Sequence, residues 1–381
     1  MVGQSVGNFL ITKLIGGGGM GTVYRAEHPE LGRQAAVKIL HPELAADAEI
    51  VQRFFNEARA ANAVGHRGIV EALDFGRLPS GAPYIVMELL SGESLAERLR
   101  RVGRLPAEVA IPIADHMAAA LGAAHAKGIV HRDLKPDNVF LVADPDRADR
   151  APVKILDFGV AKLQGPVAGG GDLRTRTGIV MGTPQYMSPE QCRDARDVDH
   201  RADVYSLGVV LHEMLAGRPP FSSSSWGELV HMHIGVAPPS LRACGVDVPA
   251  PLEAIVLRAL AKDPGARFAS MEELRQELRA ATPDLTGGAA VAGLPIPTAG
   301  GAPARTLVMP DRAEPPASAS PVTPTLPNPP PATALLGSQP RRSHHTTLSG
   351  TASELDDRAR PRRARSGWAG AAAIGACLVA A

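Results

Sequence analysis

The densest group of polar side chains in the sequence is the octet His131-Arg132-Asp133-Leu134-Lys135-Pro136-Asp137-Asn138. It holds one imidazole, two cations, two carboxylates and one carboxamide. Another carboxylate, Asp157, follows the hydrophobic run Val153-Lys154-Ile155-Leu156, nineteen residues after the last position of the octet. Such groups can move a proton, stabilise developing negative charge and offer oxygens to a hard metal ion. Their density beside strand-like segments predicts an active-site loop.

The octet resembles the catalytic loop of protein kinases, and Asp157-Phe158-Gly159 resembles the metal-binding motif of the same family. The resemblance implies that Asp133 orients the acceptor hydroxyl and accepts its proton. Lys135 would stabilise the transferring phosphoryl group, and its placement is similar to Ser/Thr kinases rather than tyrosine kinases. Asn138 and Asp157 would hold Mg²⁺, with Mn²⁺ as an alternative, and the phosphoryl donor would be ATP.

A glycine-rich turn joins two strand-like segments near the N-terminus. Residues 8–15 alternate apolar and polar side chains, Gly16-Gly17-Gly18-Gly19-Met20-Gly21 follows, and Thr22-Val23-Tyr24-Arg25-Ala26 resumes the strand pattern. Taken alone, this is equally typical of a plain flexible hairpin. It also resembles the kinase loop that folds over ATP phosphates. The resemblance implies nucleotide contacts from Ile15, Gly16, Gly18, Gly21, Val23 and Ala36.

A lysine and a glutamate complete the expected phosphate site. Lys38 ends the apolar segment Ala35-Ala36-Val37, where a kinase places the lysine that holds the α- and β-phosphates, although it could simply be a solvated strand end. Residues 51–64 have helical character, and Glu57 is their best-placed partner for Lys38; the alternative is a surface glutamate. The resemblance also makes Met87 the gatekeeper and gives adenine contacts to the backbones of Glu88 and Leu90.

Several further residues resemble structural positions of the kinase family. Residues 107–127 form a long Ala-rich helical stretch that Gly128 ends before the octet. The stretch Thr183-Pro184-Gln185-Tyr186-Met187-Ser188-Pro189-Glu190 resembles the end of an activation segment, with Ser188 where Ala is common. The resemblance implies structural roles, bracing the loop or anchoring the segment, for His131, Thr183, Glu190, Asp203 and Arg267.

Arg132 predicts regulation of the activation segment. An arginine beside the catalytic aspartate leaves a cation that a phosphate on that segment can neutralise. Thr175 and Thr177, in Leu173-Arg174-Thr175-Arg176-Thr177, are the candidates for autophosphorylation in trans, which calls for a homodimer. The alternative is an unmodified loop.

Composition restricts the partners and the compartment. Lys+Arg 40 against Asp+Glu 39 gives a formal net charge of +1, so nucleic acid is not expected as a partner. The three cysteines, Cys192, Cys244 and Cys377, are far apart, and the first residues lack the pattern of a signal peptide. A catalytic domain in the reducing cytoplasm is expected.

The C-terminal quarter, residues 282–381, differs in composition from the rest of the chain. Fifteen of the 34 prolines lie beyond Thr282, and no Phe, Tyr or Trp occurs between Phe268 and Trp368, so residues 282–357 are expected to be a disordered Pro-rich linker. Residues 358–367 hold five arginines, and residues 368–381 are uncharged. Those 14 residues would span ~21 Å as a helix against a ~30 Å hydrocarbon core. The apolar run is predicted to be part of a transmembrane segment that tethers the catalytic domain to the inner face of the cell membrane. The alternative is a disordered tail whose basic segment is solvated.

We therefore expect an α+β, bilobal protein kinase fold: an N-terminal extension (1–8), a catalytic domain (9–281), the linker, the basic segment and the apolar tail. Its N-lobe, about residues 9–89, would be a small antiparallel sheet with one helix, and its C-lobe, about 90–281, would be mainly helical. The sequence is similar to bacterial eukaryotic-like, receptor-like Ser/Thr kinases, which act on protein substrates in signal transduction. One alternative is a nucleotide-binding pseudokinase scaffold, whose usual mark is loss of Lys38, Asp133 or Asp157; all three are present here. Another is a signalling platform that displays phosphothreonine.

Overall fold

The structure is a computed structural model that describes residues 1–143, 152–158, 184–193 and 198–281. The predicted site residues Thr175, Thr177 and Thr183 lie outside these ranges, as do Gly159 and the whole of the expected linker and tail. No helix within the described ranges is both long enough and apolar enough to cross a membrane.

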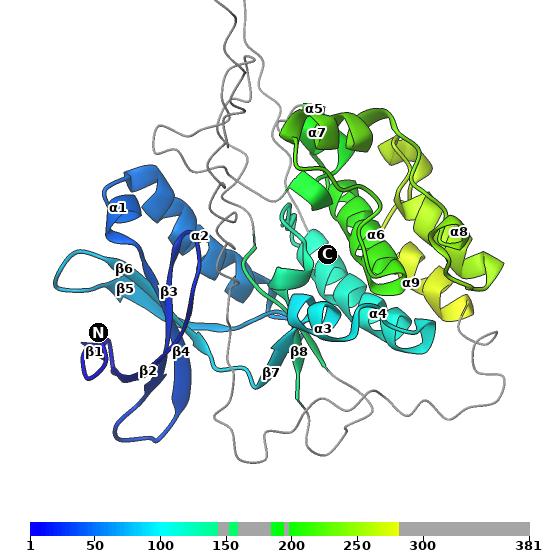
Figure 1. The fold of residues 1–381 in the computed structure, drawn as a ribbon. Helices are drawn as coiled ribbons and strands as arrows, with labels where there is room; N and C mark the ends of the chain where they lie inside the picture. The colour runs from blue at the N-terminus through cyan, green and yellow to red at the C-terminus, as the bar shows by residue number, and fades with distance from the viewer. Residues whose placement is uncertain (144–151, 159–183, 194–197, 282–381) are drawn as a thin grey trace, which may run out of the picture. The chain divides into compact units, whose positions relative to one another are not determined.

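The N-terminal part is a six-stranded sheet with the order β1-β2-β3-β4-β6-β5, in which every neighbouring pair is antiparallel (Figure 1). In β2, Phe9 and Ile11 are buried while Leu10 and Thr12 are exposed, which is the alternation that the sequence predicted. The strands are β1 (Ser5–Val6), β2 (Phe9–Gly17), β3 (Gly21–Glu27), β4 (Gln34–Leu40), β5 (Ala72–Arg77) and β6 (Pro83–Glu88).

Helix α2 (Ala48–Val64) packs against this sheet and is preceded by the four-residue helix α1 (Pro42–Ala45). The Asp47 side chain caps the N-terminus of α2 by accepting hydrogen bonds from the amides of Glu49 and Ile50, so α2 begins three residues before the expected 51–64 stretch. Gly65 ends the helix in the left-handed conformation, with φ 62°. The buried face of α2 is apolar except for one carboxylate, Glu57.

A second, three-stranded antiparallel sheet with the order β7-β8-β9 carries the polar loop. It consists of β7 (Gly92–Ser94), β8 (Val139–Val142) and β9 (Val153–Ile155). The short helix η1 (Pro136–Asn138) leads into β8, and Asp157 lies two residues after β9. The loop and Asp157 therefore meet at one end of this sheet.

The remaining described part is helical, and α4 and α6 are its central pair. Four residues of α4 are fully buried: Ala110, Ala114, Ala118 and Ala120. Their small side chains let the neighbouring helices pack closely against α4. The helices are α3 (Leu95–Val102), α4 (Ala107–His125), α5 (Pro189–Arg193), α6 (Arg201–Ala216), α7 (Trp226–Gly235), α8 (Ala250–Ala259) and α9 (Met271–Ala280), with short 3₁₀ helices η2 (Pro184–Tyr186), η4 (Arg242–Cys244) and η5 (Pro264–Ala266). The expected division into a sheet-rich N-lobe and a helical C-lobe is confirmed.

Candidate active site

The polar octet and Asp157 are brought together by the pairing of β8 with β9. Val139 is opposite Ile155, and the Leu156 amide donates to the Asn138 carbonyl at 2.9 Å. Within the loop, Lys135 Nζ lies 3.6 Å from Asp133 Oδ2. The Asn138 side-chain amide donates to the Asp133 carbonyl at 2.9 Å and to its Oδ2 at 3.3 Å. Four predicted groups, Asp133, Lys135, Asn138 and Asp157, thus gather at one place.

Asn138 and Asp157 fit the donor set of a hard divalent metal. The Nδ2 of Asn138 is used within the loop, but its Oδ1 is buried and has no hydrogen-bond partner among the residues that the structure describes. A buried oxygen that receives no hydrogen bond lowers the stability of the fold, unless a bound ion or molecule contacts that oxygen. Burial would raise the pKa of Asp157, but the charge and hydrogen bond of Lys38 outweigh it and hold the pKa below its usual value. Asp157 is therefore a carboxylate that can bind a cation.

Lys38 on β4 lies between two carboxylates. Its Nζ is 2.9 Å from Asp157 Oδ2 and 4.0 Å from Glu57 Oε2. Burial would lower the pKa of Lys38, but Asp157 first and Glu57 second raise it above its usual value, so the amine is a cation. The predicted pairing with Glu57 is present at the limit of an ion pair, and the closer partner, Asp157, was not expected from the sequence.

The apolar residues predicted to hold the nucleotide form one cluster beneath the sheet. Val23, Ala36, Met87 and Leu90 are buried in it, Ile15 packs against it, and Phe140 and Leu156 close it from the second sheet. The strand register explains this, because Val23 is opposite Lys38 and Ala36 is opposite Met87 across the ladder. Residues from β2, β3, β4 and β6 therefore line the same face of the sheet as Lys38.

The glycine turn forms a tight hairpin between β2 and β3. Gly18 and Gly21 exchange backbone hydrogen bonds at 2.9 and 3.3 Å. A Cβ at Gly21 would lie 2.4 Å from the Ile39 carbonyl oxygen, so only glycine lets β3 approach β4 here. His41 Nε2 lies 3.0 Å from the Gly18 carbonyl and holds the turn from the start of α1, a contact that no sequence motif indicated.

Asp203 on α6 holds the start of the polar loop. Its carboxylate accepts from the amides of His131 and Arg132, each at 2.8 Å, and lies 2.7 Å from His125 Nε2. The carboxylate is fully buried. Burial would raise the pKa of Asp203, but the His125 contact first, and His131 and the Arg132 amide after it, lower it. A buried carboxylate thus anchors the backbone just before Asp133.

His131 is engaged by backbone groups at both ring nitrogens. Nε2 lies 3.1 Å from the Leu156 carbonyl, and Nδ1 accepts from the Asp133 amide at 3.2 Å. The ring also lies 4.9 Å from the Phe158 ring, and both side chains are buried. These contacts tie the loop to the segment that carries Asp157 and suit a bracing side chain better than a proton-transfer group.

Arg132 and Asp157 are the two described non-glycine residues with positive φ, at 63° and 45°. Such backbone costs about 1–3 kcal/mol and persists only where the surroundings hold it. The Arg132 guanidinium donates to the Val198 carbonyl at 3.2 Å, its buried Nε has no partner, and it forms no ion pair with a carboxylate in the described part of the chain.

Glu190 and Arg267 form a bidentate ion pair that fixes α5. The two guanidinium nitrogens lie 2.6 and 2.8 Å from the two carboxylate oxygens, and Arg267 is only 2% exposed. Arg267 also donates to the carbonyls of Ala261 and Arg201. With its remaining donors satisfied, the buried guanidinium anchors the end of the predicted activation segment to the helical lobe.

A half-buried tyrosine–carboxylate pair next to this segment was missed by sequence reasoning. Tyr186 donates to Glu213 Oε2 at 2.7 Å. Burial, with a contribution from Asp137, raises the pKa of Glu213 to about 6, from a usual value of 4.5. Nothing in the sequence separates Glu213 from an ordinary helix-surface glutamate, because the partner lies 27 residues away.

We expect a Glu213→Gln variant to lose pH dependence of stability near pH 6. A raised folded-state pKa means that the carboxyl contributes stability below pH 4.5 and loses it as the pH rises through about 6. The variant should therefore gain stability relative to the wild type across that interval, by up to about 2 kcal/mol. Urea unfolding of both proteins from pH 4.5 to 7.5 measures the difference. Parallel stability curves would contradict the expectation.

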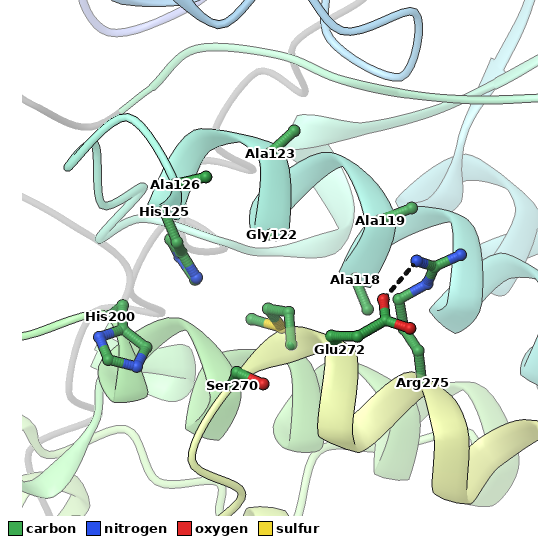
Figure 2. Close-up of a pocket in the computed structure, with 11 residues that line it drawn as sticks. Ala118, Ala119, Gly122, Ala123, His125, Ala126, His200, Ser270, Glu272 and Arg275 are labelled. Atoms are coloured by element: carbon green, nitrogen blue, oxygen red, sulfur yellow. Dashed lines mark hydrogen bonds and ion pairs between the residues drawn. The ribbon is translucent and has the colours of Figure 1, made fainter. Parts of the chain in front are cut away.

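A cavity of about 440 Å³ lies between α4 and α9 (Figure 2). Its lining includes small residues of α4 together with His200, Ser270 and the ion-paired Glu272 and Arg275. None of the predicted catalytic, nucleotide or metal residues lines it. His125 is in its wall and contacts Asp203, so the cavity borders the anchor of the polar loop without being part of the site.

A small antiparallel sheet over a helical lobe, with a glycine hairpin, a buried lysine and a polar loop between them, is the architecture of a phosphotransferase that uses a nucleotide. The family model for the protein kinase domain matches residues 9–278. The chain therefore belongs to the protein kinase family. Proteins of this family use ATP and a divalent metal ion.

Curated relatives are bacterial serine/threonine-protein kinases. The chain is 44% identical over 282 residues to Pkn1 of Myxococcus xanthus, which covers 74% of this chain and 39% of that protein. It is 40% identical over 271 residues to PknB of Mycobacterium tuberculosis, covering 70% of this chain and 41% of that protein. The chain thus spans about half or less of the length of these relatives. Its structure is similar to the Mycobacterium tuberculosis PknI kinase domain, with a TM-score of 0.58, 29% identity, and coverage of 74% of this chain and 99% of that one.

Proposed function

We propose that the chain is a protein serine/threonine kinase that transfers the γ-phosphoryl group of Mg-ATP to Ser or Thr hydroxyls of proteins. The observation that carries the proposal is the gathering of Asp133, Lys135, Asn138 and Asp157 next to the buried Lys38. Relatives whose names state this activity support it.

In the proposed reaction, Asp133 accepts a hydrogen bond from the acceptor hydroxyl, orients its oxygen in line with the γ-phosphorus, and takes the proton as the new P–O bond forms. Lys135, 3.6 Å from Asp133, neutralises charge on the phosphoryl group. The bond from the γ-phosphorus to the bridging oxygen breaks and leaves ADP. Lys38 contacts the α- and β-phosphates and is itself held by Glu57.

Mg²⁺, or Mn²⁺ in its place, would bind Asn138 Oδ1 and Asp157 and neutralise phosphate charge when bound. The buried Asn138 oxygen, which has no hydrogen-bond partner within the described ranges, supports this role. The glycine hairpin, with Gly16, Gly18 and Gly21, would cover the phosphates. The amide of Glu88 already donates to the Glu71 carbonyl at 3.0 Å, so its carbonyl and the Leu90 amide are proposed to bind adenine.

Transfer of γ-labelled phosphate from ATP to a Ser/Thr-rich acceptor protein tests the proposal. We expect labelled phosphoserine and phosphothreonine, no phosphotyrosine, and no transfer after removal of divalent metal with a chelator. The competing function is a pseudokinase scaffold, which binds nucleotide without transferring phosphate. Nucleotide binding with no labelled acceptor would reject the kinase and leave the scaffold. The presence of Lys38, Asp133 and Asp157 argues against the scaffold.

We also propose activation by autophosphorylation of Thr175 or Thr177 in trans, within a transient homodimer. The support is Arg132, whose guanidinium has no carboxylate partner among the described residues and so can pair with a phosphate. Such a protein would also display phosphothreonine to binding partners.

Incubation with Mg-ATP should place phosphate on one or both threonines, and Thr175→Ala/Thr177→Ala should lower activity. Mass spectrometry locates the phosphate. Mixing the wild type with a catalytically inactive Asp133→Asn chain of distinct mass separates the trans from the cis reaction, since only trans transfer labels the inactive chain. A fully active double variant would contradict the regulatory role.

For residues 282–381 we propose a Pro-rich linker (282–357), a basic segment (358–367) and an apolar segment (368–381) that tethers a cytoplasmic kinase domain to the inner face of the membrane. The five arginines before the uncharged run support this orientation. We expect the whole chain to partition with membranes and a chain ending at Asp357 to remain in solution. Equal solubility of the two chains would reject the tether.

A further inference from the structure

Gln191 on α5 joins the end of the activation segment to the catalytic loop. Its Nε2 donates to the Arg132 carbonyl at 2.8 Å, and its Oε1 accepts from the Ser188 amide at 2.9 Å. The side chain is 6% exposed. Both polar atoms of the carboxamide therefore form hydrogen bonds within the protein, one to the catalytic loop and one to the end of the activation segment.

The acceptor of the Gln191 hydrogen bond belongs to the peptide unit directly before Asp133. The carbonyl of that unit, from Arg132, binds Gln191, and its N–H, from Asp133, donates to His131 Nδ1 at 3.2 Å. The plane of this peptide is thus held from both edges. Because a peptide is rigid and planar, fixing its plane fixes the direction in which the chain enters Asp133.

Arg132 makes this restraint necessary, because its φ of 63° is unfavourable for a side chain with a Cβ. Asp203 holds the amide on one side of Arg132, at 2.8 Å, and Gln191 holds the carbonyl on the other. Without the second contact, the residue could relax by rotating the peptide that leads into Asp133.

The position of α5 is itself fixed by the neighbouring residue. Glu190 forms the bidentate pair with Arg267, which is buried against the helical lobe. Gln191 therefore reaches Arg132 only when the end of the activation segment is seated on that lobe. A displaced segment would withdraw the amide donor from the peptide beside the catalytic aspartate.

We propose that Gln191 is a positioning residue for Asp133, and that it couples seating of the activation segment to the geometry of the catalytic carboxylate. The inference rests on the proposed kinase function. It assigns no contact between Gln191 and substrate, nucleotide or metal: the side chain acts through the Arg132–Asp133 peptide.

Two variants and one control separate the contacts. Gln191→Met keeps the approximate size and removes both hydrogen bonds. Gln191→Glu can still accept from the Ser188 amide but presents an oxygen to the Arg132 carbonyl in place of the donor. Ser188→Ala removes only the hydroxyl oxygen that accepts a hydrogen bond from the backbone N–H of Gln191 at 3.4 Å. It leaves the contact between the Gln191 side chain and the Arg132 carbonyl intact.

Steady-state kinetics and hydrogen exchange measure the effect. Both Gln191 variants should lower kcat by about 10- to 100-fold, the cost expected for a misplaced reacting group, with KM for ATP unchanged. Backbone exchange should become faster in the peptide that contains residues 131–135. Ser188→Ala should resemble the wild type in both measurements. Thermal unfolding identifies a variant that has simply lost its fold.

Unchanged kcat in folded Gln191→Met, or a loss of activity expressed only in KM for ATP, would overturn the positioning role. If the wild type itself transfers no phosphate, the proposed kinase function is rejected. Hydrogen exchange then still tests whether Gln191 restrains the peptide before Asp133. Faster exchange at residues 131–135 in Gln191→Met but not in Ser188→Ala would then support the restraint, and equal exchange would reject it.

Discussion

Asp133→Asn should reduce kcat by about 10²–10⁴-fold while the protein stays folded and binds ATP as before. The carboxamide has nearly the same size and can still accept a hydrogen bond, but it cannot take the proton of the acceptor hydroxyl. KM for ATP should not change, because no contact with the nucleotide is proposed for Asp133 itself, which contacts Lys135 and Asn138 within the loop. Single-turnover phosphoryl transfer under saturating ATP measures the loss directly.

Asp247→Asn provides the matched control, since the same chemical change is made at an exposed carboxylate in the helical lobe. Its kcat should equal that of the wild type. Comparable activity of Asp133→Asn and Asp247→Asn would remove Asp133 from the proposed reaction and favour the scaffold.

Asp203→Ala should be among the most destabilising single substitutions in the catalytic domain. It leaves the buried amide of His131 and the half-buried amide of Arg132 without their acceptor, and each unsatisfied group costs up to about 1–3 kcal/mol. Activity should fall as well, because the same two amides hold the loop before Asp133. Urea unfolding measures the stability, and phosphoryl transfer below the unfolding temperature measures the activity.

The pH dependence of this effect distinguishes the carboxylate from its surroundings. The pKa of Asp203 is lowered in the folded protein, so its contribution is complete above the usual value of about 3.9 and is lost only as the pH falls through the lowered value. The penalty of Asp203→Ala should therefore persist down to pH 5, where the carboxylate is still charged and still accepts from both amides. Asp247→Ala, at the exposed position, should cost almost nothing. A penalty that vanishes at pH 5 would contradict the assignment.

Local chemistry of the site was predictable from the sequence because the catalytic loop is continuous. Asp133, Lys135 and Asn138 lie within the octet, and their spacing alone brings them near each other. The alternation in β2 and the Ala-rich α4 were also predictable, because each follows from a local periodicity. The boundaries shifted by a few residues where a cap decided them, as Asp47 does for α2.

Glu57 illustrates what a sequence pattern can and cannot predict about a site residue. It is a charged residue on the buried, otherwise apolar face of α2, which marks it as a residue in need of a partner. The pattern does not name the partner. Only the packing of the second sheet beneath β4 places Asp157 closer to Lys38 than Glu57 is, at 2.9 Å against 4.0 Å.

The sequence by itself determined the family to which the chain belongs and the two-lobed architecture, and it indicated the groups that we propose for the chemistry. Tertiary structure decided which long-range contacts form: the Asp203 carboxylate and the Gln191 link to Arg132, which hold the loop, and the Tyr186–Glu213 pair beside them. The physical reason is that a side-chain hydrogen bond depends on a few ångströms of approach between segments that can be 59 to 72 residues apart. A glutamine in a five-residue helix carries no periodicity that points to its partner, so that contact is seen only once α5 is seated beside the catalytic loop.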